Sequence, residues 1–132
     1  MASILVVDDQ QNFRFSLAVT LKREGHDVAE AGNGQQAVKS VSGRGFDIVV
    51  TDLKMPGMDG LALLREIKKM TPQTEVVVMT AFGSVDSAVE AMRHGACDYI
   101  TKPFQPEELV LVVGRTLQKM GFTRRIKALE SL

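Results

Sequence analysis

The chain has 132 residues, 45% of them hydrophobic and 24% charged, and these values predict one globular domain and exclude a disordered chain, a coiled-coil rod and a collagen-like chain. Its 16 basic and 16 acidic side chains balance, so no overall charge draws the domain to nucleic acid or to an anionic membrane. The single cysteine, Cys97, excludes an internal disulfide. No apolar run approaches the roughly 18 residues of a membrane helix, and the first residues lack the pattern of a signal peptide. We therefore expect a cytoplasmic domain.

The first half of the chain alternates between strand and helix patterns. A short apolar run over 4–7 predicts a buried strand, and it ends in Asp8 and Asp9. Apolar residues recur at helical spacing after Phe13, and a later apolar strand leads to Asp52. The predicted elements of this half are strands over 4–7, 27–31 and 46–50 and helices over 13–23 and 35–41.

The second half continues this alternation. A turn-rich loop, KMPGMDG, comes shortly after Asp52, and a strand over 75–79 leads to Thr80. A short strand over 98–101 is followed by Lys102-Pro103. The other predicted helices run from Leu61, after Gly60, up to Thr71, and from a cap at Ser84 or Asp86 to His94. A last regular helix begins near Pro106 and buries Leu109, Val112, Val113 and Leu117. The tail from Phe122 is an extra helix or the start of a linker.

Five strands alternating with five helices predict an α/β fold, a five-stranded parallel sheet with helices on both faces. Right-handed crossovers favour the flavodoxin-like, doubly wound strand order 2-1-3-4-5. Ligands bind such a sheet at the carboxyl ends of its strands, where the order reverses between the first and third strands. Because Asp8, Asp9 and Asp52 end these two strands, we expect an acidic crevice there.

The predicted crevice has the chemical groups of a phosphoryl-transfer site. Converging carboxylates repel each other unless a proton or a cation joins them, and a site made only of oxygen atoms suits Mg²⁺, which also binds phosphate oxygens. Thr80 and Lys102 end the fourth and fifth strands and reach the same edge of the sheet. A carboxylate nucleophile, a metal, a hydroxyl and an ammonium can together take a phosphoryl group onto Asp52.

The residues at these strand ends form one ordered set, namely Asp8-Asp9, Asp52, Thr80, Tyr99 and Lys102-Pro103. The set resembles that of the receiver (CheY-like) domain of two-component response regulators, and the resemblance covers residues 3 to about 120. It implies a signalling switch that catalyses its own phosphorylation and dephosphorylation, and not a conventional turnover enzyme.

The resemblance also assigns a role to each site residue. It implies that Asp52 accepts a phosphoryl group from the phosphohistidine of a sensor histidine kinase. Asp9 and Asp52 would bind Mg²⁺ together with the backbone carbonyl of Lys54, Asp8 would act mainly through water, and Mn²⁺ could replace Mg²⁺.

Three further roles concern the response to phosphorylation. Thr80 and Lys102 would bind phosphoryl oxygens, and the Lys102-Pro103 peptide bond would be cis. Tyr99 would be an aromatic switch that turns inward when Thr80 moves, which shifts the face formed by the fourth helix, the fifth strand and the fifth helix. Taken alone, Tyr99 is also typical of ordinary strand packing.

Three stretches, DDQQNFRFSL, TDLKMPGMDG and TAFGSVDSAVEAMRHGACDYITKPF, are similar to receivers of the nitrogen-regulation (NtrC-like) type, which govern sigma-54-dependent transcription activators. In that family a dimerising linker helix leads to an ATPase and then a DNA-binding domain. The chain contains no phosphate-binding loop and no helix-turn-helix after the fifth helix. We therefore expect a receiver domain over residues 1–120, the start of a linker helix over 121–132, a homodimer, and output domains outside this sequence.

Two other protein classes use similar groups. A haloacid-dehalogenase-type phosphatase also has an aspartate nucleophile, Mg²⁺, Thr and Lys. Its motif is DxD, however, in which a second acid follows two residues after the nucleophile, and this chain has Lys54 at that position. A flavodoxin-like cofactor-binding module would offer phosphate-binding donors in its first loop, where Asp8 and Asp9 would repel a phosphate. The sequence alone leaves both alternatives open.

Overall fold

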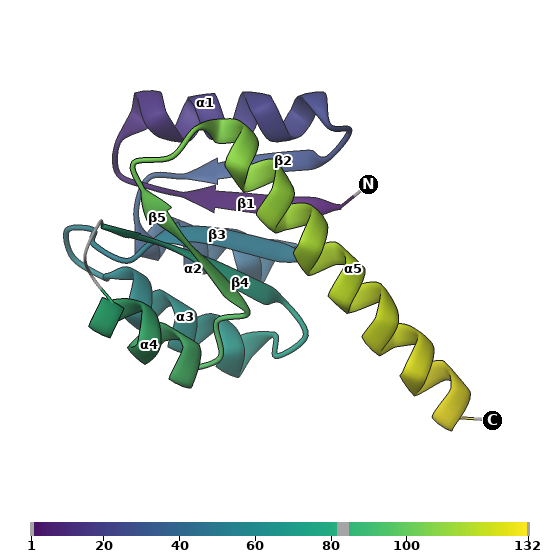
Figure 1. The fold of residues 1–132 in the computed structure, drawn as a ribbon. Helices are drawn as coiled ribbons and strands as arrows, with labels where there is room; N and C mark the ends of the chain where they lie inside the picture. Colours follow the sequence, from purple (N-terminus) through teal and green to yellow (C-terminus); the bar gives the residue numbers. More distant parts are fainter. Residues whose placement is uncertain (1, 82–84, 132) are drawn as a thin grey trace.

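Strands and helices alternate along the chain in a computed structural model, which describes residues 2–81 and 85–131 apart from the side chains of residues 122–128 (Figure 1). The strands are β1 (Ser3–Val7), β2 (Asp27–Ala31), β3 (Ile48–Asp52), β4 (Glu75–Ala81) and β5 (Asp98–Lys102). The helices are α1 (Gln11–Arg23), α2 (Gly34–Gly43), α3 (Gly60–Met70), α4 (Val85–Arg93) and α5 (Pro106–Glu130). This order of elements confirms the predicted α/β fold.

The described strands form one parallel sheet in the order β2-β1-β3-β4-β5, as predicted. The register pairs Asp52 with Met79 and Thr80 with Thr101. Since all the strands run in the same direction, their carboxyl ends lie at one edge of the sheet. The predicted site residues at or just beyond these ends are Asp8, Asp52, Thr80 and Lys102.

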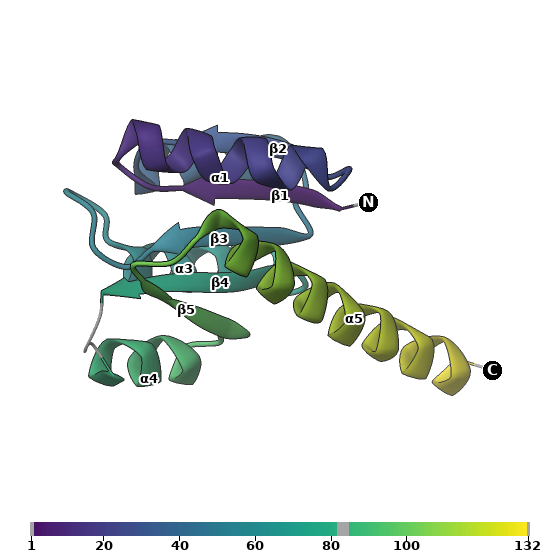
Figure 2. The same ribbon diagram turned by 45° about the horizontal axis from the view of Figure 1, so that its top comes forward.

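Helices cover both faces of the sheet, and each face has its own hydrophobic core (Figures 1 and 2). The helices α1 and α5 pack on one face, and α2, α3 and α4 pack on the other. Alternate residues of β3 serve the two cores, because Ile48 and Val50 belong to the first and Val49 to the second. Fully buried helix residues include Leu17, Leu21, Leu109 and Val113 in the first core and Ala37, Leu64, Ile67 and Ala91 in the second.

The third strand is shifted from its predicted position. The apolar run predicted a strand over 46–50, whereas β3 begins at Ile48 and continues through the polar residues Thr51 and Asp52. Phe46 is buried in the core although it lies outside the strand. An apolar run marks where the chain is buried, but backbone hydrogen bonds define the strand, and the ladder bonds continue up to Asp52. The acceptor candidate is therefore the last residue of the strand itself.

The start of α4 differs from one of the two predicted caps. The helix begins at Val85, so Asp86 lies inside its first turn and is not a cap. An acid in the first turn still interacts favourably with the partial positive charge of the helix N-terminus. The other predicted cap, Ser84, lies outside the described residues.

The last helix is longer than predicted. The expected break near residue 120 is absent, and α5 runs without interruption from Pro106 to Glu130. Its first turns pack against the sheet, and its C-terminal half extends past the sheet into solvent (Figure 2). None of the described helices is both long and apolar enough to span a membrane.

Candidate functional site

Three carboxylates meet where β1 and β3 end. One oxygen atom from each of Asp8, Asp9 and Asp52 lies within 4.8 Å of the others. Asp8 is fully buried, the side chain of Asp52 is 13% exposed, and Asp9 is exposed. The strand order thus brings together acids that are 44 residues apart in the sequence, 8 to 52, and it confirms the predicted acidic crevice.

Lys102 joins two of these acids. Its Nζ donates to Asp8 Oδ2 at 3.0 Å and to Asp52 Oδ2 at 2.8 Å. Burial alone would lower the pKa of Lys102, but the hydrogen bonds to Asp52 and Asp8 and the charges of both carboxylates outweigh burial and raise the pKa above its ordinary value. Lys102 is therefore a fixed positive charge at neutral pH.

An aromatic ring from α1 also contacts this ammonium. Nζ of Lys102 lies 4.8 Å from the centre of the Phe13 ring, and Phe104 packs edge-on against Phe13 with the ring centres 5.5 Å apart. The helical spacing of Phe13 in the sequence predicts a helix there but gives no sign that the ring lies under the lysine. The two aromatic rings therefore restrict the positions that the Lys102 ammonium group can adopt.

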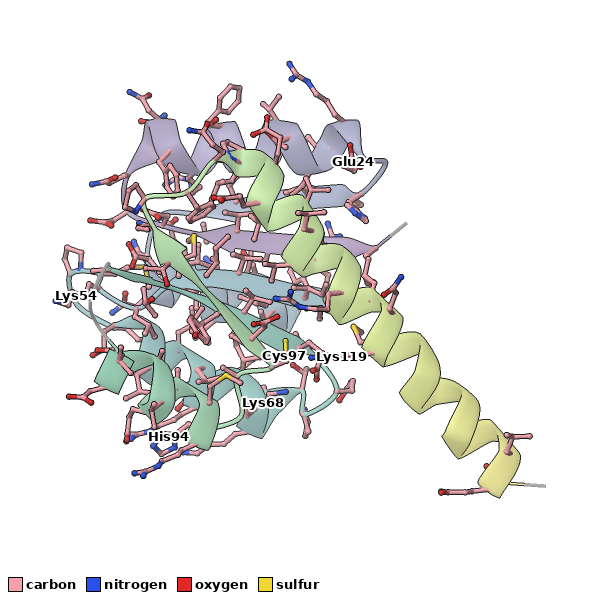
Figure 3. All side chains as sticks on the ribbon, viewed as in Figure 1. Glu24, Lys54, Lys68, His94, Cys97 and Lys119 are labelled. Carbon is pink, nitrogen blue, oxygen red and sulfur yellow. The ribbon has the colours of Figure 1, made fainter. Side chains whose placement is uncertain are left out.

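A small cavity lies beside Asp52, and Asp8 is not among its lining residues. It has a volume of about 130 Å³, and its lining residues include Thr80, Lys102 and Lys54. The N–H of Lys54 donates to Asp52 Oδ1 at 3.2 Å, and the Lys54 side chain extends into solvent (Figure 3). Ser87 at the start of α4 also lines this cavity, and no pattern in the sequence predicts this position.

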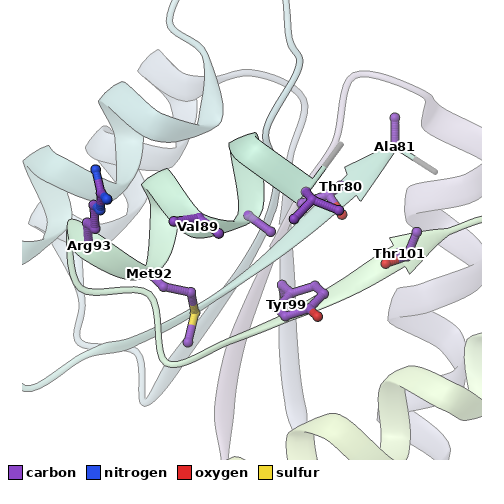
Figure 4. A pocket seen from close by; sticks show the side chains of 9 residues that line it. Thr80, Ala81, Val89, Met92, Arg93, Tyr99 and Thr101 are labelled. Atoms are coloured by element: carbon purple, nitrogen blue, oxygen red, sulfur yellow. The ribbon is translucent and has the colours of Figure 1, made fainter. Parts of the chain in front are cut away.

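Tyr99 does not line this cavity but a larger one next to it. This second cavity, of about 460 Å³, lies between α4 and the strands β4 and β5, and Tyr99 and Met92 are among its lining residues (Figure 4). Tyr99 is 47% exposed. Thr80, which is 3% exposed, lines both cavities. A movement of this threonine would therefore change the space available in both cavities.

Two backbone features shape the loops around the acids. The Lys102–Pro103 peptide bond is cis, the geometry that the resemblance implies. Gly60, the first residue of α3, approaches the end of β3 so closely that a Cβ atom there would overlap the carbonyl oxygen of Asp52. Asp59 caps the same helix by accepting the N–H of Ala62 at 2.9 Å. The loop after Asp52 is thus held at both of its ends.

The donor set of the acidic cluster fits a hard divalent cation. All three side chains offer carboxylate oxygens, no described His or Cys joins them, and one acid is open to solvent. Lys102 supplies one positive charge to three carboxylates, which leaves an excess of negative charge for a cation to neutralise. The cluster can therefore hold a metal beside a carboxylate that faces a cavity.

Comparison with known proteins decides the family. Residues 4–114 match the family model of the response regulator receiver domain. The chain belongs to the response regulator receiver domain family. Membership in this family sets aside the phosphatase and the flavodoxin-like cofactor module that the sequence left open.

Curated relatives agree with this assignment. The receiver domain is 40% identical to regulatory protein AtoC of Escherichia coli (strain K12) over 126 residues, which cover 96% of this chain and 27% of that protein. It is 44% identical to transcriptional regulatory protein ZraR of Klebsiella oxytoca, over 86% of this chain and 26% of that protein. The DNA-binding transcriptional regulator NtrC of Escherichia coli (strain K12) is 39% identical, over 86% of this chain and 24% of that protein.

Solved structures point to the same subfamily. NtrX from Brucella abortus superposes with a TM-score of 0.93 at 39% identity, over 97% of this chain and 29% of that chain. The isolated receiver domain of NtrX has a TM-score of 0.83 at 41% identity, over 87% of this chain and 98% of that chain. The NtrC-like subfamily predicted from the sequence is confirmed, and the receiver domain spans about a quarter of the length of the curated relatives named above.

Proposed function

We propose that this receiver domain accepts a phosphoryl group on Asp52 from the phosphohistidine of a sensor histidine kinase. The observation that carries the proposal is the position of the Asp52 carboxylate, which borders a cavity and is held at Oδ1 by the Lys54 N–H and at Oδ2 by Lys102. Two bonds orient the carboxylate, while the cavity leaves room for an incoming phosphoryl group. No other described acid of the cluster lines this cavity.

The transfer forms one bond and breaks another. An oxygen of Asp52 attacks the phosphorus atom, the P–N bond to the kinase imidazole breaks, and its electron pair stays on the leaving nitrogen. The product on this chain is an aspartyl phosphate, whose later hydrolysis by water restores the carboxylate. Lys102, which already contacts Asp52, would donate to one negatively charged phosphoryl oxygen, and the Thr80 hydroxyl would donate to another.

The acidic cluster would hold Mg²⁺, or Mn²⁺ in its place, during this reaction. Asp9 and Asp52 would bind the ion directly with the backbone carbonyl of Lys54, and Asp8 would bind through water. When bound, the ion would neutralise charge that develops on the phosphoryl oxygens. Support comes from the carboxylate oxygens that lie within 4.8 Å of one another.

The response to phosphorylation would pass through Thr80. This residue borders both the Asp52 cavity and the cavity under α4, so a movement of its side chain toward a phosphoryl group would vacate space beside Tyr99. Tyr99, which is 47% exposed, would then turn inward and shift the population of conformations of α4, β5 and α5. This movement would constitute the output signal.

The relatives suggest what the signal controls. AtoC, ZraR and NtrC are named as regulatory or transcriptional regulatory proteins, and we propose that this receiver regulates a sigma-54-dependent transcription activator with an ATPase and a DNA-binding domain. Residues 1–120 would form the receiver, and residues 121–132 would begin a linker helix that dimerises. Such a protein would act in the cytoplasm, where its kinase and its target genes meet it.

The test uses a phosphoryl mimic and intact mass. Acetyl phosphate with Mg²⁺ should add one phosphoryl group to the wild-type chain, and beryllium fluoride should shift the amide signals of α4 and β5. Asp52→Asn should abolish both effects because an amide does not attack phosphorus. Asp27→Asn is a matched control, since Asp27 begins β2 at the opposite edge of the sheet, where it pairs with Arg44. A wild-type response in Asp52→Asn would contradict the proposal.

A further inference from the structure

Arg14 connects the acidic cluster to the neighbouring strand. Its Nη1 donates to the main-chain oxygen of Asp8 at 2.8 Å, and its Nε donates to Glu30 Oε1 at 3.0 Å. Only 16% of the Arg14 side chain is exposed. A side chain on α1 thus ties the loop after β1 to the last residues of β2, although nothing in the sequence pattern marks it.

A glycine leaves room for this guanidinium. A Cβ atom on Gly32 would lie 3.2 Å from Nη1 of Arg14, closer than a side chain normally tolerates without a shift of its neighbour. Gly32 does not have a positive φ, so its backbone would accept an alanine. The absence of a side chain at Gly32 is therefore a spatial requirement of the Arg14 position.

The hydrogen bonds of Asp8 divide into two groups. Its main chain is held by two bonds, from its N–H to the oxygen of Ala31 at 3.2 Å and from Arg14 to its oxygen at 2.8 Å. Its carboxylate is held by the N–H of Gln10 at 2.8 Å and by Lys102 at 3.0 Å. Arg14 is thus the one described side chain that fixes the backbone from which Asp8 and Asp9 project.

We propose that Arg14 is a positioning residue that holds the loop of Asp8 and Asp9 in the geometry needed to bind the divalent cation, and that Glu30 cancels its charge. The inference rests on the proposed function, since it concerns the cation of that site. An uncompensated guanidinium beside the cluster would repel a cation. The ion pair with Glu30, whose side chain is 27% exposed, makes the contact to Asp8 available without a net positive charge.

The direction in which a mutation of Arg14 changes Mg²⁺ affinity distinguishes a positioning role from a purely electrostatic one. If Arg14 acted only through its charge, Arg14→Gln would strengthen Mg²⁺ binding because a repelling cation is removed. If Arg14 positions the loop, the same variant weakens Mg²⁺ binding because the ligands must be ordered when the ion binds. Glu30→Gln should also weaken binding, and more so at low ionic strength, because the guanidinium is then uncompensated.

The experiment measures Mg²⁺ affinity by calorimetry on the whole 132-residue chain, without any phosphodonor. We expect Arg14→Gln to bind Mg²⁺ about tenfold more weakly, the lower end of what the loss of an outer-sphere partner causes. Gly32→Ala, which keeps the charge and displaces the guanidinium, should change affinity in the same direction. Arg44→Gln is the matched control, because Arg44 pairs with Asp27 at the other end of β2 and should leave the affinity unchanged.

A second readout needs no metal. In the metal-free chain, hydrogen exchange at the amides of Asp8 and Gln10 should be faster in Arg14→Gln than in wild type and unchanged in Arg44→Gln. A lower melting temperature with unaltered Mg²⁺ affinity would assign Arg14 a purely structural role and overturn the proposal, as would tighter binding. Failure of the wild-type chain to bind Mg²⁺ would contradict the proposed function, while the exchange experiment would still test the position of the loop.

Discussion

The ammonium of Lys102 lies 2.8 Å from Oδ2 of Asp52, so the proposed phosphoryl acceptor is paired with a cation before any donor arrives. The same ammonium lies 3.0 Å from Oδ2 of Asp8, which is fully buried. The lysine therefore has two effects, a favourable one on the stability of the metal-free site and an unfavourable one on metal binding. It stabilises two carboxylates that would otherwise repel each other, and it competes with a metal for them.

Replacing this lysine should separate the two effects. Lys102→Met leaves Asp8 buried without its cation, and we expect the free energy of unfolding to fall by about 1–3 kcal/mol in the absence of metal. Mg²⁺ should restore more stability to the variant than to wild type, because the competing charge is gone. Phosphorylation by acetyl phosphate should nevertheless be slower, since no ammonium remains to bind the phosphoryl oxygens.

Urea unfolding with and without Mg²⁺ measures the first two effects, and the rate of mass gain measures the third. Lys69→Met is the control, because Lys69 is exposed near the end of α3, away from the acidic cluster. If Lys102→Met unfolded at the same urea concentration as wild type without metal, the ion pairs to Asp8 and Asp52 would contribute nothing to stability.

The cavity under α4 gives a prediction about Tyr99. Ala88 lines this cavity from α4 and is 6% exposed. Ala88→Leu should occupy the space into which Tyr99 is proposed to turn, so beryllium fluoride should still bind at Asp52 while the tyrosine signal shifts less than in wild type. Tyr99 is the one tyrosine of the chain, so a fluorinated tyrosine label reports on this residue alone. Val89→Ala enlarges the same cavity, and the Tyr99 signal of this control should shift at least as far as in wild type.

The pH dependence of stability should reveal His26. Burial lowers the pKa of His26 below its ordinary value of 6.5, and its Nδ1 accepts the N–H of Ala2 at 3.1 Å. Because the folded chain binds this proton less readily than the unfolded chain, His26 costs stability as the pH falls through 6.5 and has no effect well above it. His26→Asn keeps an acceptor for Ala2 and removes the titration.

The stability difference between about pH 7.5 and pH 5.5 should therefore be smaller in His26→Asn than in wild type. His94→Asn changes the other histidine of the chain and should retain the contribution of His26. Equal losses of stability in wild type and His26→Asn would mean that His26 takes up its proton in the folded state as readily as in the unfolded state. Urea unfolding at the two pH values provides the measurement.

The C-terminal half of α5 gives a prediction about assembly. The helix extends past the sheet, and Leu129 near its end is 68% exposed. A short helical segment is marginal in water unless tertiary contacts stabilise it. The sequence places Phe122, Ile126 and Leu129 at helical spacing, although the side chains of the first two lie outside the described residues. We expect the whole chain to dimerise through this segment.

Sedimentation of the whole chain and of a chain that ends at Met120 tests this expectation. The shorter chain should sediment as a monomer and the longer one as a dimer. Leu111→Ser changes another leucine of α5, 72% exposed, but on the part of the helix that lies beside the sheet, and it should leave the dimer intact. Equal masses for the two lengths would place any association elsewhere.

The order of the strands and the acidic crevice were predictable from the sequence for a physical reason. In a parallel sheet each strand is a short apolar run, and the residue after it reaches the edge where ligands bind. Asp8, Asp52 and Lys102 each follow or end such a run, so their meeting follows from topology alone. Thr80 is predictable in the same way.

Contacts made sideways from helices were not predictable. Arg14 and Phe13 are adjacent in α1, yet one reaches β2 and the Asp8 backbone while the other lies under Lys102. Helical periodicity shows which face of α1 is buried but not which strand end each side chain meets. The length of α5 was also missed, because Gly121 suggested a break, whereas the helix continues through this glycine to Glu130.

Gly60 has a consequence for the use of this domain as a tool. Its missing side chain lets α3 begin directly against the carbonyl of Asp52, where even a methyl group would overlap the main chain. Gly60→Ala would displace the strand end that carries the acceptor while leaving every charged group of the chain unaltered. Gly60→Ala is therefore a candidate for an inactive reference form that keeps the isoelectric point and the ion-exchange behaviour of the native domain.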